Sequence, residues 1–142
     1  MQIHRTGSAT WTGGLKDGVG SISTQSGALT AYPYGFKSRF EGVAGSNPEE
    51  LLGAAHAACF TMALSLVLGE AGITAERMDT KAIVELAQTS DGFAIPKIEL
   101  QLTATIPGTD DATFQKHAAT AKANCPVSKL FNAEITLTAV LA

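Results

Sequence analysis

The longest apolar stretch of the chain, residues 51–69, predicts the element around which the rest is organised. It reads LLGAAHAACFTMALSLVLG and contains no Asp, Glu, Lys or Arg. The preceding residues 47–50, Asn-Pro-Glu-Glu, have the chemistry of a helix start, because Asn47 can accept from free backbone amides and proline suits the first helical position. Gly72 is a natural stop. We therefore predict one helix from Pro48 to Ala71, roughly 36 Å long at the helical rise per residue.

A helix this apolar has two interpretations. Its length and composition approach those of a transmembrane helix, but acidic residues flank it where basic ones are expected on one side of a span: Glu49, Glu50 and Glu70. Alternatively, a helix that is apolar on all sides is buried in a core, and Cys59 near its middle is a small buried hydrophobe. We favour the buried helix and expect no membrane association.

Shorter alternating patterns before this helix predict strands. Segments from Gln2 to Trp11 and from Gly20 to Thr24 are separated by glycine turns, which is typical of an antiparallel meander. Residues 36–40, Phe-Lys-Ser-Arg-Phe, also alternate and place both phenylalanines on one face of a strand. Arg39 lies on the other face, either as a functional cation or as a solvated charge at a strand edge.

Beyond the long helix the pattern predicts two strands and then helices. Lys81 to Thr89 and Ile98 to Ile106 are the strands, and Asp91 with Gly92 favours a hairpin turn between them. Thr109 or Asp110 can cap a helix that runs to about Ala123, with an apolar stripe pointing towards the core: Phe114, Ala118, Ala121 and Cys125. A short helix over Cys125 to Asn132 and a final strand from Glu134 to Leu141 complete the chain.

Together these elements predict an α+β fold in a single domain over residues 1–142, with antiparallel sheets packed around the long central helix. The strand meander and loop occupy residues 1–45, the central helix 46–72, and the strand pair, helix, short helix and final strand 73–142. The 45% hydrophobic and 16% charged content fits one compact domain.

Charge and leader signals narrow the function classes. The net charge of -3 and the lack of any basic run argue against nucleic-acid binding. The first residues, MQIHRTG, lack the apolar run of a secretory signal, so we expect a cytoplasmic protein. In the cytosol, two cysteines are more often catalytic, redox-sensing or unpaired than joined in a structural disulfide.

Cys59 and Cys125 are the strongest candidates for chemistry, and three interpretations of them remain open. With His56 on the same helical face as Cys59 they could form a metal site, although zinc sites use three or four such ligands and no other histidine has ligand-like spacing. They could instead form a reversible disulfide in thiol peroxidase chemistry, or they could be inert. His56 itself is expected to be a core or interface histidine.

Reactivity requires a thiolate, and an apolar site in the middle of a helix raises the pKa of a thiol such as Cys59. A cation must therefore reach Cys59 from elsewhere. Lys129 and Arg39 are the candidates, and arginine is better because it stays charged when desolvated. Cys125, at a helix N-terminus, is easier to ionise by local reasoning, so the residues alone leave the roles of the two thiols open.

Three motifs resemble one known family. They are YGFKSRFEG at residues 34–42, GSNPEELLGAAHAACF at 45–60 and CPVSK at 125–129. These motifs closely resemble the osmotically inducible protein C family, OsmC/Ohr, and the similarity covers essentially the whole chain. The position of Arg39 shortly before the central helix is similar to the OsmC branch, whereas the Ohr branch has its arginine earlier in the chain.

The resemblance implies a thiol-dependent peroxidase that reduces hydroperoxides, preferably organic ones, and works as an intertwined homodimer. Cys59 matches the family's peroxidatic cysteine and Cys125 its resolving cysteine. Arg39 matches the arginine that stabilises the thiolate, and Glu49 the acid that holds this arginine.

In this chemistry the Cys59 thiolate attacks the distal peroxide oxygen, and the resulting sulfenic acid condenses with Cys125 to give a disulfide and water. Arg39 would lower the pKa of Cys59 and stabilise charge as the O–O bond breaks. An external dithiol, of lipoyl type by resemblance to the Ohr branch, would reopen the disulfide, and no metal, flavin or haem is required. An apolar group on the peroxide would suit the aromatic surroundings, Phe36, Phe40 and Phe60.

Helix geometry predicts a composite site. Glu49 and Cys59 are ten residues apart on one helix, which is roughly 15 Å along its axis, so they cannot share a site within one chain. If two copies of the helix cross antiparallel, Glu49 of one chain can approach Cys59 of the other and hold Arg39 there. Small residues would permit the close crossing: Gly53, Ala54, Ala57 and Ala58.

Two other function classes remain as alternatives. One is a non-catalytic redox-responsive or small-molecule-binding protein on the same fold, in which the two cysteines only lock a conformation. The other is a structural metal-binding protein. Repeated turnover of a hydroperoxide separates the enzyme from both.

Overall fold

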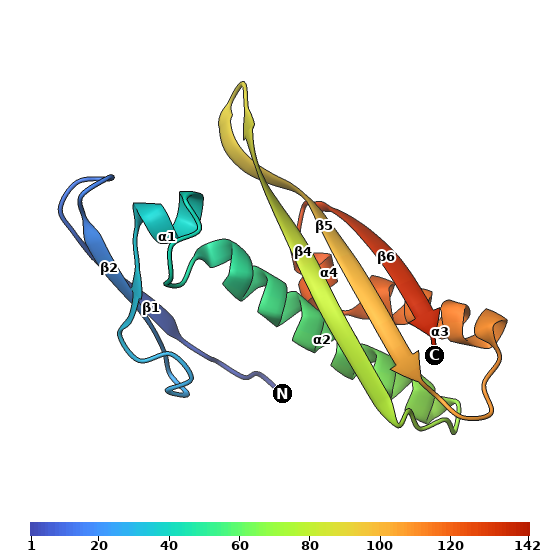
Figure 1. Ribbon diagram of the computed structural model, residues 1–142. Coiled ribbons are helices and arrows are strands. Elements are labelled where there is room, and N and C mark those ends of the chain that lie inside the picture. The colour runs from blue at the N-terminus through green and yellow to red at the C-terminus, as the bar shows by residue number, and fades with distance from the viewer. The chain divides into compact units, whose positions relative to one another are not determined.

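The computed structural model describes residues 1–142, and the backbone groups into two compact units, Met1–Leu51 and Leu52–Ala142. Each unit contains one three-stranded sheet (Figure 1). Helix α2 (Pro48–Glu70) begins in the first unit and continues through the second. The predicted α+β fold with a long apolar helix is confirmed, whereas its description as a single domain stays a prediction.

The first unit is built on an antiparallel meander, as predicted. Its strands pair in the order β1 (Gly7–Thr12), β2 (Val19–Thr24) and β3 (Tyr32–Tyr34). The Trp11 and Tyr34 rings pack 5.4 Å apart. Gly20 pairs with both residues, and a side chain there would clash with the Tyr34 ring and come within 2.7 Å of Trp11. Glycine in β2 therefore lets the two rings meet across the sheet.

Residues Phe36–Phe40 form a short helix, α1, and the strand that their alternation predicted is wrong. The Ser38 hydroxyl accepts from the Gly35 amide at 2.9 Å and lies 3.0 Å from the Gly35 carbonyl, so it satisfies backbone groups that a strand would have paired. Phe36 and Phe40 are four residues apart, a spacing that shares a face in a helix as well as in a strand, and their rings pack at 4.9 Å. A pattern this short does not distinguish the two.

The loop from α1 to α2 is fixed by two serines and one glycine. The Ser38 hydroxyl lies 2.9 Å from the Ser46 carbonyl, and the Ser46 amide donates to the Pro33 carbonyl at 3.0 Å. Gly45 has a φ of 148°, and a side chain there would come within 2.8 Å of the Ser38 Cβ. Glycine is therefore needed for the backbone conformation and for the close approach that holds α1 near the start of α2.

The ends of α2 follow the predicted capping chemistry. The Asn47 Oδ1 accepts from the Glu50 amide at 2.8 Å, which satisfies one of the free donors at the helix start. At the other end Gly72 has a φ of 71°, and the Ile73 amide donates to the Leu68 carbonyl at 2.9 Å. This is the geometry of a glycine helix stop.

The second unit contains a mixed sheet rather than the antiparallel sheet expected. Its strands lie in the order β4 (Arg77–Thr89), β5 (Gly92–Thr105) and β6 (Glu134–Leu141). β4 and β5 form the predicted antiparallel hairpin, but β6 pairs with β5 in parallel. Helices α3 (Asp111–Asn124) and α4 (Pro126–Leu130) connect β5 to β6, because parallel neighbours need such a crossover.

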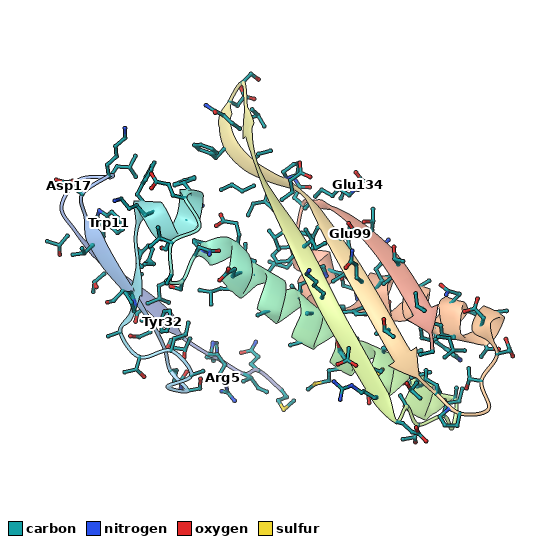
Figure 2. All side chains as sticks on the ribbon, viewed as in Figure 1. Arg5, Trp11, Asp17, Tyr32, Glu99 and Glu134 are labelled. Carbon is teal, nitrogen blue, oxygen red and sulfur yellow. The ribbon has the colours of Figure 1, made fainter.

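The core of the second unit lies between this sheet and helices α2 and α3 (Figure 1). β5 and the residue after it bury alternate side chains, namely Ile98, Leu100, Leu102, Ala104 and Ile106. α3 and the residue that caps its C-terminal end form the predicted stripe, which is fully buried: Phe114, Ala118, Ala121 and Cys125. Glu99 lies on the other face of β5 (Figure 2), and its carboxylate accepts from the Gln101 side-chain amide at 2.9 Å. The predicted alternation of buried side chains in β5 and the predicted helical spacing of the stripe on α3 are therefore confirmed.

Only one stripe of α2 is buried within the chain. Its members are spaced by three or four residues: Gly53, His56, Phe60, Leu64 and Leu68. On other sides of the helix Met62 is 76% and Leu66 64% exposed. By length and composition alone α2 is also the one helix that could cross a membrane, with a mean hydropathy of 1.9. The expected burial of α2 is thus only partly achieved within a single chain.

Gly53 faces β4 rather than the exposed side of α2. A side chain at this position would meet the Ala82 carbonyl and the Val84 side chain at 3.4 Å. Gly53 therefore allows the close approach of α2 to β4 within the chain, and its place at a crossing with a second helix stays a prediction. Ala54 and Ala58 are exposed small residues of α2.

Candidate functional site

Cys59 and Cys125 lie together in the second unit, one on α2 and one at the junction of α3 and α4. Both are free thiols, Cys125 fully buried and Cys59 half-buried, and a hydrogen bond joins them. The Cys125 amide donates to the Ala121 carbonyl at 2.9 Å, and its carbonyl accepts from the Lys129 amide at 3.1 Å. The end of α3 and the start of α4 therefore fix Cys125 beside α2.

The two thiols differ in acidity within one chain. Burial and the hydrogen bond with Cys125 raise the pKa of Cys59, and the Val127 amide offsets only part of this. Burial also opposes ionisation of Cys125, but hydrogen bonds from Cys59, from the Ser128 amide and hydroxyl, and from the Val127 amide lower its pKa overall. Proton sharing between the thiols therefore favours Cys125 as the thiolate, as its place at a helix N-terminus predicts.

Ser128 and His56 extend these polar contacts into the core. The Ser128 hydroxyl is hydrogen-bonded to the Cys125 thiol and lies 2.8 Å from the His56 Nε2. His56 is fully buried, packs edge-on against Phe131 at 5.3 Å, and has a pKa lowered by burial, so its ring is neutral at pH 7. His56 is thus the core histidine that was predicted, whereas the sequence did not single out Ser128.

Cys59 opens onto an apolar groove of about 630 Å³ between α2 and the junction of α3 and α4. Aliphatic, thioether and proline side chains make up most of its lining, including Met62, Leu66, Val67 and Pro126, and Glu70 is its charged residue. Phe60 is fully buried in the core. The expectation that Phe60 surrounds a substrate is therefore wrong, since the groove at the thiol is aliphatic.

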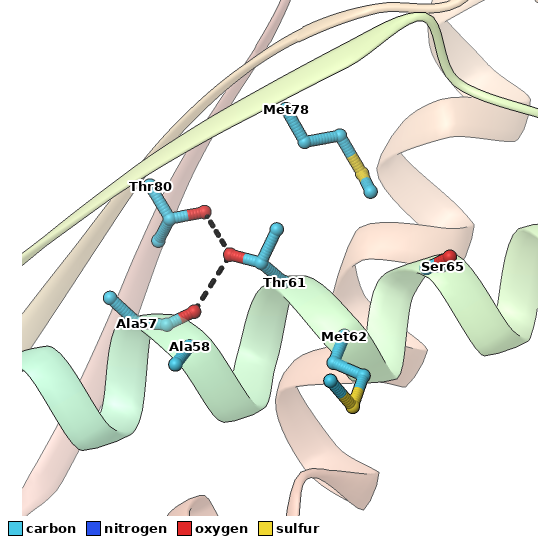
Figure 3. A pocket seen from close by; sticks show the side chains of 7 residues that line it. All are labelled: Ala57, Ala58, Thr61, Met62, Ser65, Met78 and Thr80. Carbon is cyan, nitrogen blue, oxygen red and sulfur yellow. Dashed lines mark hydrogen bonds between the residues drawn. The ribbon is translucent and has the colours of Figure 1, made fainter. Parts of the chain in front are cut away.

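A second groove, of about 520 Å³, lies between α2 and β4 and is lined by none of the predicted site residues (Figure 3). In it the Thr61 hydroxyl lies 2.7 Å from both the Ala57 carbonyl and the Thr80 hydroxyl. These threonines therefore satisfy each other and the backbone. Of these two grooves, only the groove at Cys59 has a thiol in its lining.

Arg39 and Glu49 form an ion pair in the first unit. The Arg39 Nη2 donates to the Glu49 Oε1 at 2.8 Å, and the Nε donates to the same oxygen at 3.2 Å. The Arg39 side chain is 37% exposed and that of Glu49 11%. The Arg39 Nη1 has no partner within the chain, so the guanidinium keeps free donors. The pair forms within one chain, whereas we expected Glu49 of a second chain to hold Arg39.

Aromatic side chains surround Arg39. Its guanidinium lies over the Phe40 ring at 5.4 Å, and it borders a groove of about 190 Å³ lined also by Trp11, Leu15, Tyr34 and Phe36. Phe36 and Phe40, unlike Phe60, therefore do border an apolar space beside the predicted arginine.

The structure thus brings the four predicted site residues together as two pairs, the thiols in the second unit and the ion pair in the first. The metal-site interpretation has no geometric support, because no group of three His, Cys, Asp or Glu side chains lies together. His56 directs its Nε2 at Ser128 rather than at a thiol.

Residues 41–140 match the family model described as OsmC-like protein. The chain belongs to this family. The OsmC-like chain is 56% identical to the peroxiredoxin OsmC of Escherichia coli (strain K12) over 137 residues, which cover 96% of each chain. It is 31% identical over 99 residues to the organic hydroperoxide resistance protein of Xanthomonas axonopodis pv. citri (strain 306), covering 69% of this chain and 68% of that protein.

A solved structure also resembles this OsmC-like protein along its whole length. The organic hydroperoxide resistance protein from Elizabethkingia anophelis aligns with a TM-score of 0.73 and 31% sequence identity, covering 100% of both chains. The family and the fold that the three motifs implied are therefore confirmed.

Proposed function

We propose that this OsmC-like protein is a thiol-dependent peroxidase that reduces organic hydroperoxides and, more weakly, hydrogen peroxide. Relatives named as a peroxiredoxin and as organic hydroperoxide resistance proteins support peroxide chemistry. The observation that carries the proposal is the hydrogen-bonded pair of free thiols, of which Cys59 lines an apolar groove while Cys125 is fully buried. A peroxide with an apolar group can enter this groove and meet Cys59 first.

The proposed reaction has three steps. The Cys59 thiolate attacks the distal oxygen of the peroxide, an S–O bond forms as the O–O bond breaks, and the alkoxide takes a proton and leaves as alcohol. The Cys125 thiolate then attacks the oxidised sulfur, forming the S–S bond and releasing hydroxide, which is protonated to water. An external dithiol reduces the disulfide by exchange and is itself oxidised to a disulfide.

Arg39 is the proposed activator of Cys59. Burial raises the pKa of Cys59, so its thiolate needs a nearby positive charge. The guanidinium of Arg39 stays charged when desolvated and has donors that Glu49 does not use. In this proposal Glu49 aims Arg39, and Arg39 stabilises both the thiolate and the leaving oxygen.

The remaining parts of the proposal concern assembly and partners. We propose a homodimer with composite active sites, because Met62 and Leu66 of α2 are large apolar side chains that a second copy would cover.

The proposed location is the cytoplasm, and the proposed reductant is an external dithiol of lipoyl type. No resident metal, flavin or haem enters this scheme.

A turnover assay tests this function. Reduced protein with excess dithiol is given hydrogen peroxide, an alkyl hydroperoxide or a lipid hydroperoxide, and the alcohol or water formed is measured per protein chain. Many turnovers, fastest with the organic peroxides, support the peroxidase. Consumption of one equivalent that stops despite excess dithiol would instead support the non-catalytic redox-responsive alternative.

A further inference from the structure

The proposed reaction leaves one buried polar group unexplained. The His56 ring is fully buried, yet its Nδ1 has no hydrogen-bond partner. A buried polar atom without a hydrogen-bond partner destabilises the fold, and a leucine at this position would not have that cost. The presence of a histidine here therefore needs an explanation. Its one polar contact, with Ser128, leads towards the thiols.

The contacts form a continuous line from the core to the reacting sulfurs. The His56 Nε2 lies 2.8 Å from the Ser128 hydroxyl, which is hydrogen-bonded to Cys125, which in turn is hydrogen-bonded to Cys59. α2 supplies both ends of this line, since His56 and Cys59 are three residues apart on the helix. α4 supplies Ser128, three residues after Cys125.

The direction of these hydrogen bonds follows from the unpaired nitrogen. If Nδ1 carried the ring proton, a buried N–H would have no acceptor, which is among the rarer defects of native proteins. With the proton on Nε2, His56 donates to the Ser128 oxygen, and the Ser128 hydroxyl is free to donate to Cys125. Ser128 then stabilises a thiolate at Cys125, and its hydroxyl is one of the groups that lower the pKa of that thiol.

We propose that Ser128 and His56 prepare Cys125 for its attack on oxidised Cys59, Ser128 as a catalytic residue in contact with the sulfur and His56 as the positioning residue behind it. The inference rests on the peroxidase function proposed above. When Cys59 is oxidised, it no longer offers its S–H to Cys125, whereas the Ser128 donor remains. The step it promotes is the second one, in which Cys125 is oxidised, the Cys59 sulfur is reduced from sulfenic acid to disulfide, and hydroxide leaves.

The first test measures Cys125 without any peroxide. In a Cys59→Ser background, the pKa of Cys125 is followed by the ultraviolet absorbance of its thiolate. Two titratable side chains reach Cys125 from α2, Cys59 directly and His56 through Ser128, and this background removes the first. Ser128→Ala and His56→Leu should each raise the pKa of Cys125. Ser128→Thr and His56→Gln, which keep the donors, should leave it close to the parent value.

The second test measures the step itself in single turnovers with otherwise native protein. Ser128→Ala should slow disulfide formation about tenfold, since a hydrogen bond to a charged sulfur is lost, while the burst of alcohol from the first step is unchanged. Slower resolution should also increase over-oxidation of Cys59 at high peroxide. Thr61→Val is the matched control, because it removes a hydroxyl of α2, rather than of α4, that bonds only Thr80 and Ala57.

The outcomes separate the two proposals. If the parent protein gives no alcohol burst, the peroxidase function fails, but the pKa test of Cys125 still stands. If Ser128→Ala leaves both the pKa of Cys125 and the rate of disulfide formation unchanged, the assignment of Ser128 and His56 is overturned. Should His56→Leu not fold, the Ser128 variants decide the question alone.

Discussion

The thiol pair and the ion pair are held in place by opposite means. Cys59 and Cys125 are positioned by helices whose apolar stripes fill the core of the second unit. Arg39 and Glu49 are positioned by a short helix and a loop that depend on serine hydrogen bonds and one glycine. Core packing makes the position of the thiol pair insensitive to most surface substitutions. The position of the ion pair depends instead on a few polar contacts.

The same contrast separates reactivity from position. The core gives Cys59 a dry place but raises its pKa, and within one chain the hydrogen bonds favour the thiolate of Cys125 instead. The proposed order of events, with Cys59 reacting first, therefore depends on the positive charge of Arg39, whose position with Glu49 rests on only a few polar contacts. Changes in the first unit should alter the rate of the first step without unfolding the second unit.

Arg39→Gln is the change with the largest expected effect. Without its charge the thiolate fraction of Cys59 and the stabilisation of the leaving oxygen both fall, so the peroxide-reduction rate should drop by about a hundredfold or more. Because the pKa of Cys59 is raised, the residual rate should climb as pH is increased above neutrality, where more thiolate forms. Stopped-flow alcohol release across a pH series measures both effects, and a rate equal to that of the parent at neutral pH would remove Arg39 from the mechanism.

Ala118→Leu tests the packing side of the comparison. Ala118 is fully buried in the stripe of α3 that leads to Cys125, and three extra carbon atoms in a packed core should lower the free energy of unfolding by about 1–3 kcal/mol. Urea denaturation measures this. The exposed control Ala112→Leu on the same helix should change stability much less, and equal losses at both positions would contradict the packing account.

Gly45→Ala tests the loop with a smaller effect. An alanine Cβ would meet Ser38 and would force a backbone conformation that favours glycine, which should cost on the order of 1–2 kcal/mol in the first unit. The rate of peroxide reduction should fall several-fold because Arg39 is displaced, while the pKa of Cys125 stays at its parent value. Gly42→Ala is a useful comparison, since this neighbour also has a positive φ of 68° but no atom in the way of a side chain.

Much of the fold could be predicted because its signals are long. The alternation of β5 and the stripe of α3 each extend over several residue pairs or turns, and the capping residues before α2, though few, are of the types that start helices; all three are confirmed. The five residues of α1 fit either period, so their helix was missed. The parallel pairing of β6 was missed because alternation shows which face of a strand is buried but not which way its neighbour runs.

The sequence indicated which residues belong to the candidate site better than it indicated which of them are in contact. Both thiols could be found, since cysteines are rare in this chain and Cys125 continues an apolar stripe. Ser128 gave one usable signal, its place three residues after the helix-capping Cys125, where a side chain can reach back to the cap. The contact between Ser128 and His56 joins residues far apart in the sequence, so no local pattern could reveal it.

Mass spectrometry of the cysteines after one equivalent of an alkyl hydroperoxide tests the central claim most directly. The account predicts a Cys59–Cys125 disulfide within each native chain and one equivalent of alcohol. In Cys125→Ser protein it predicts sulfenic or higher acids on Cys59, and in Cys59→Ser protein it predicts an unmodified Cys125 with no peroxide consumed. Rapid oxidation of Cys125 in the absence of Cys59 would contradict it, because Cys125 would then be the thiol that meets the peroxide.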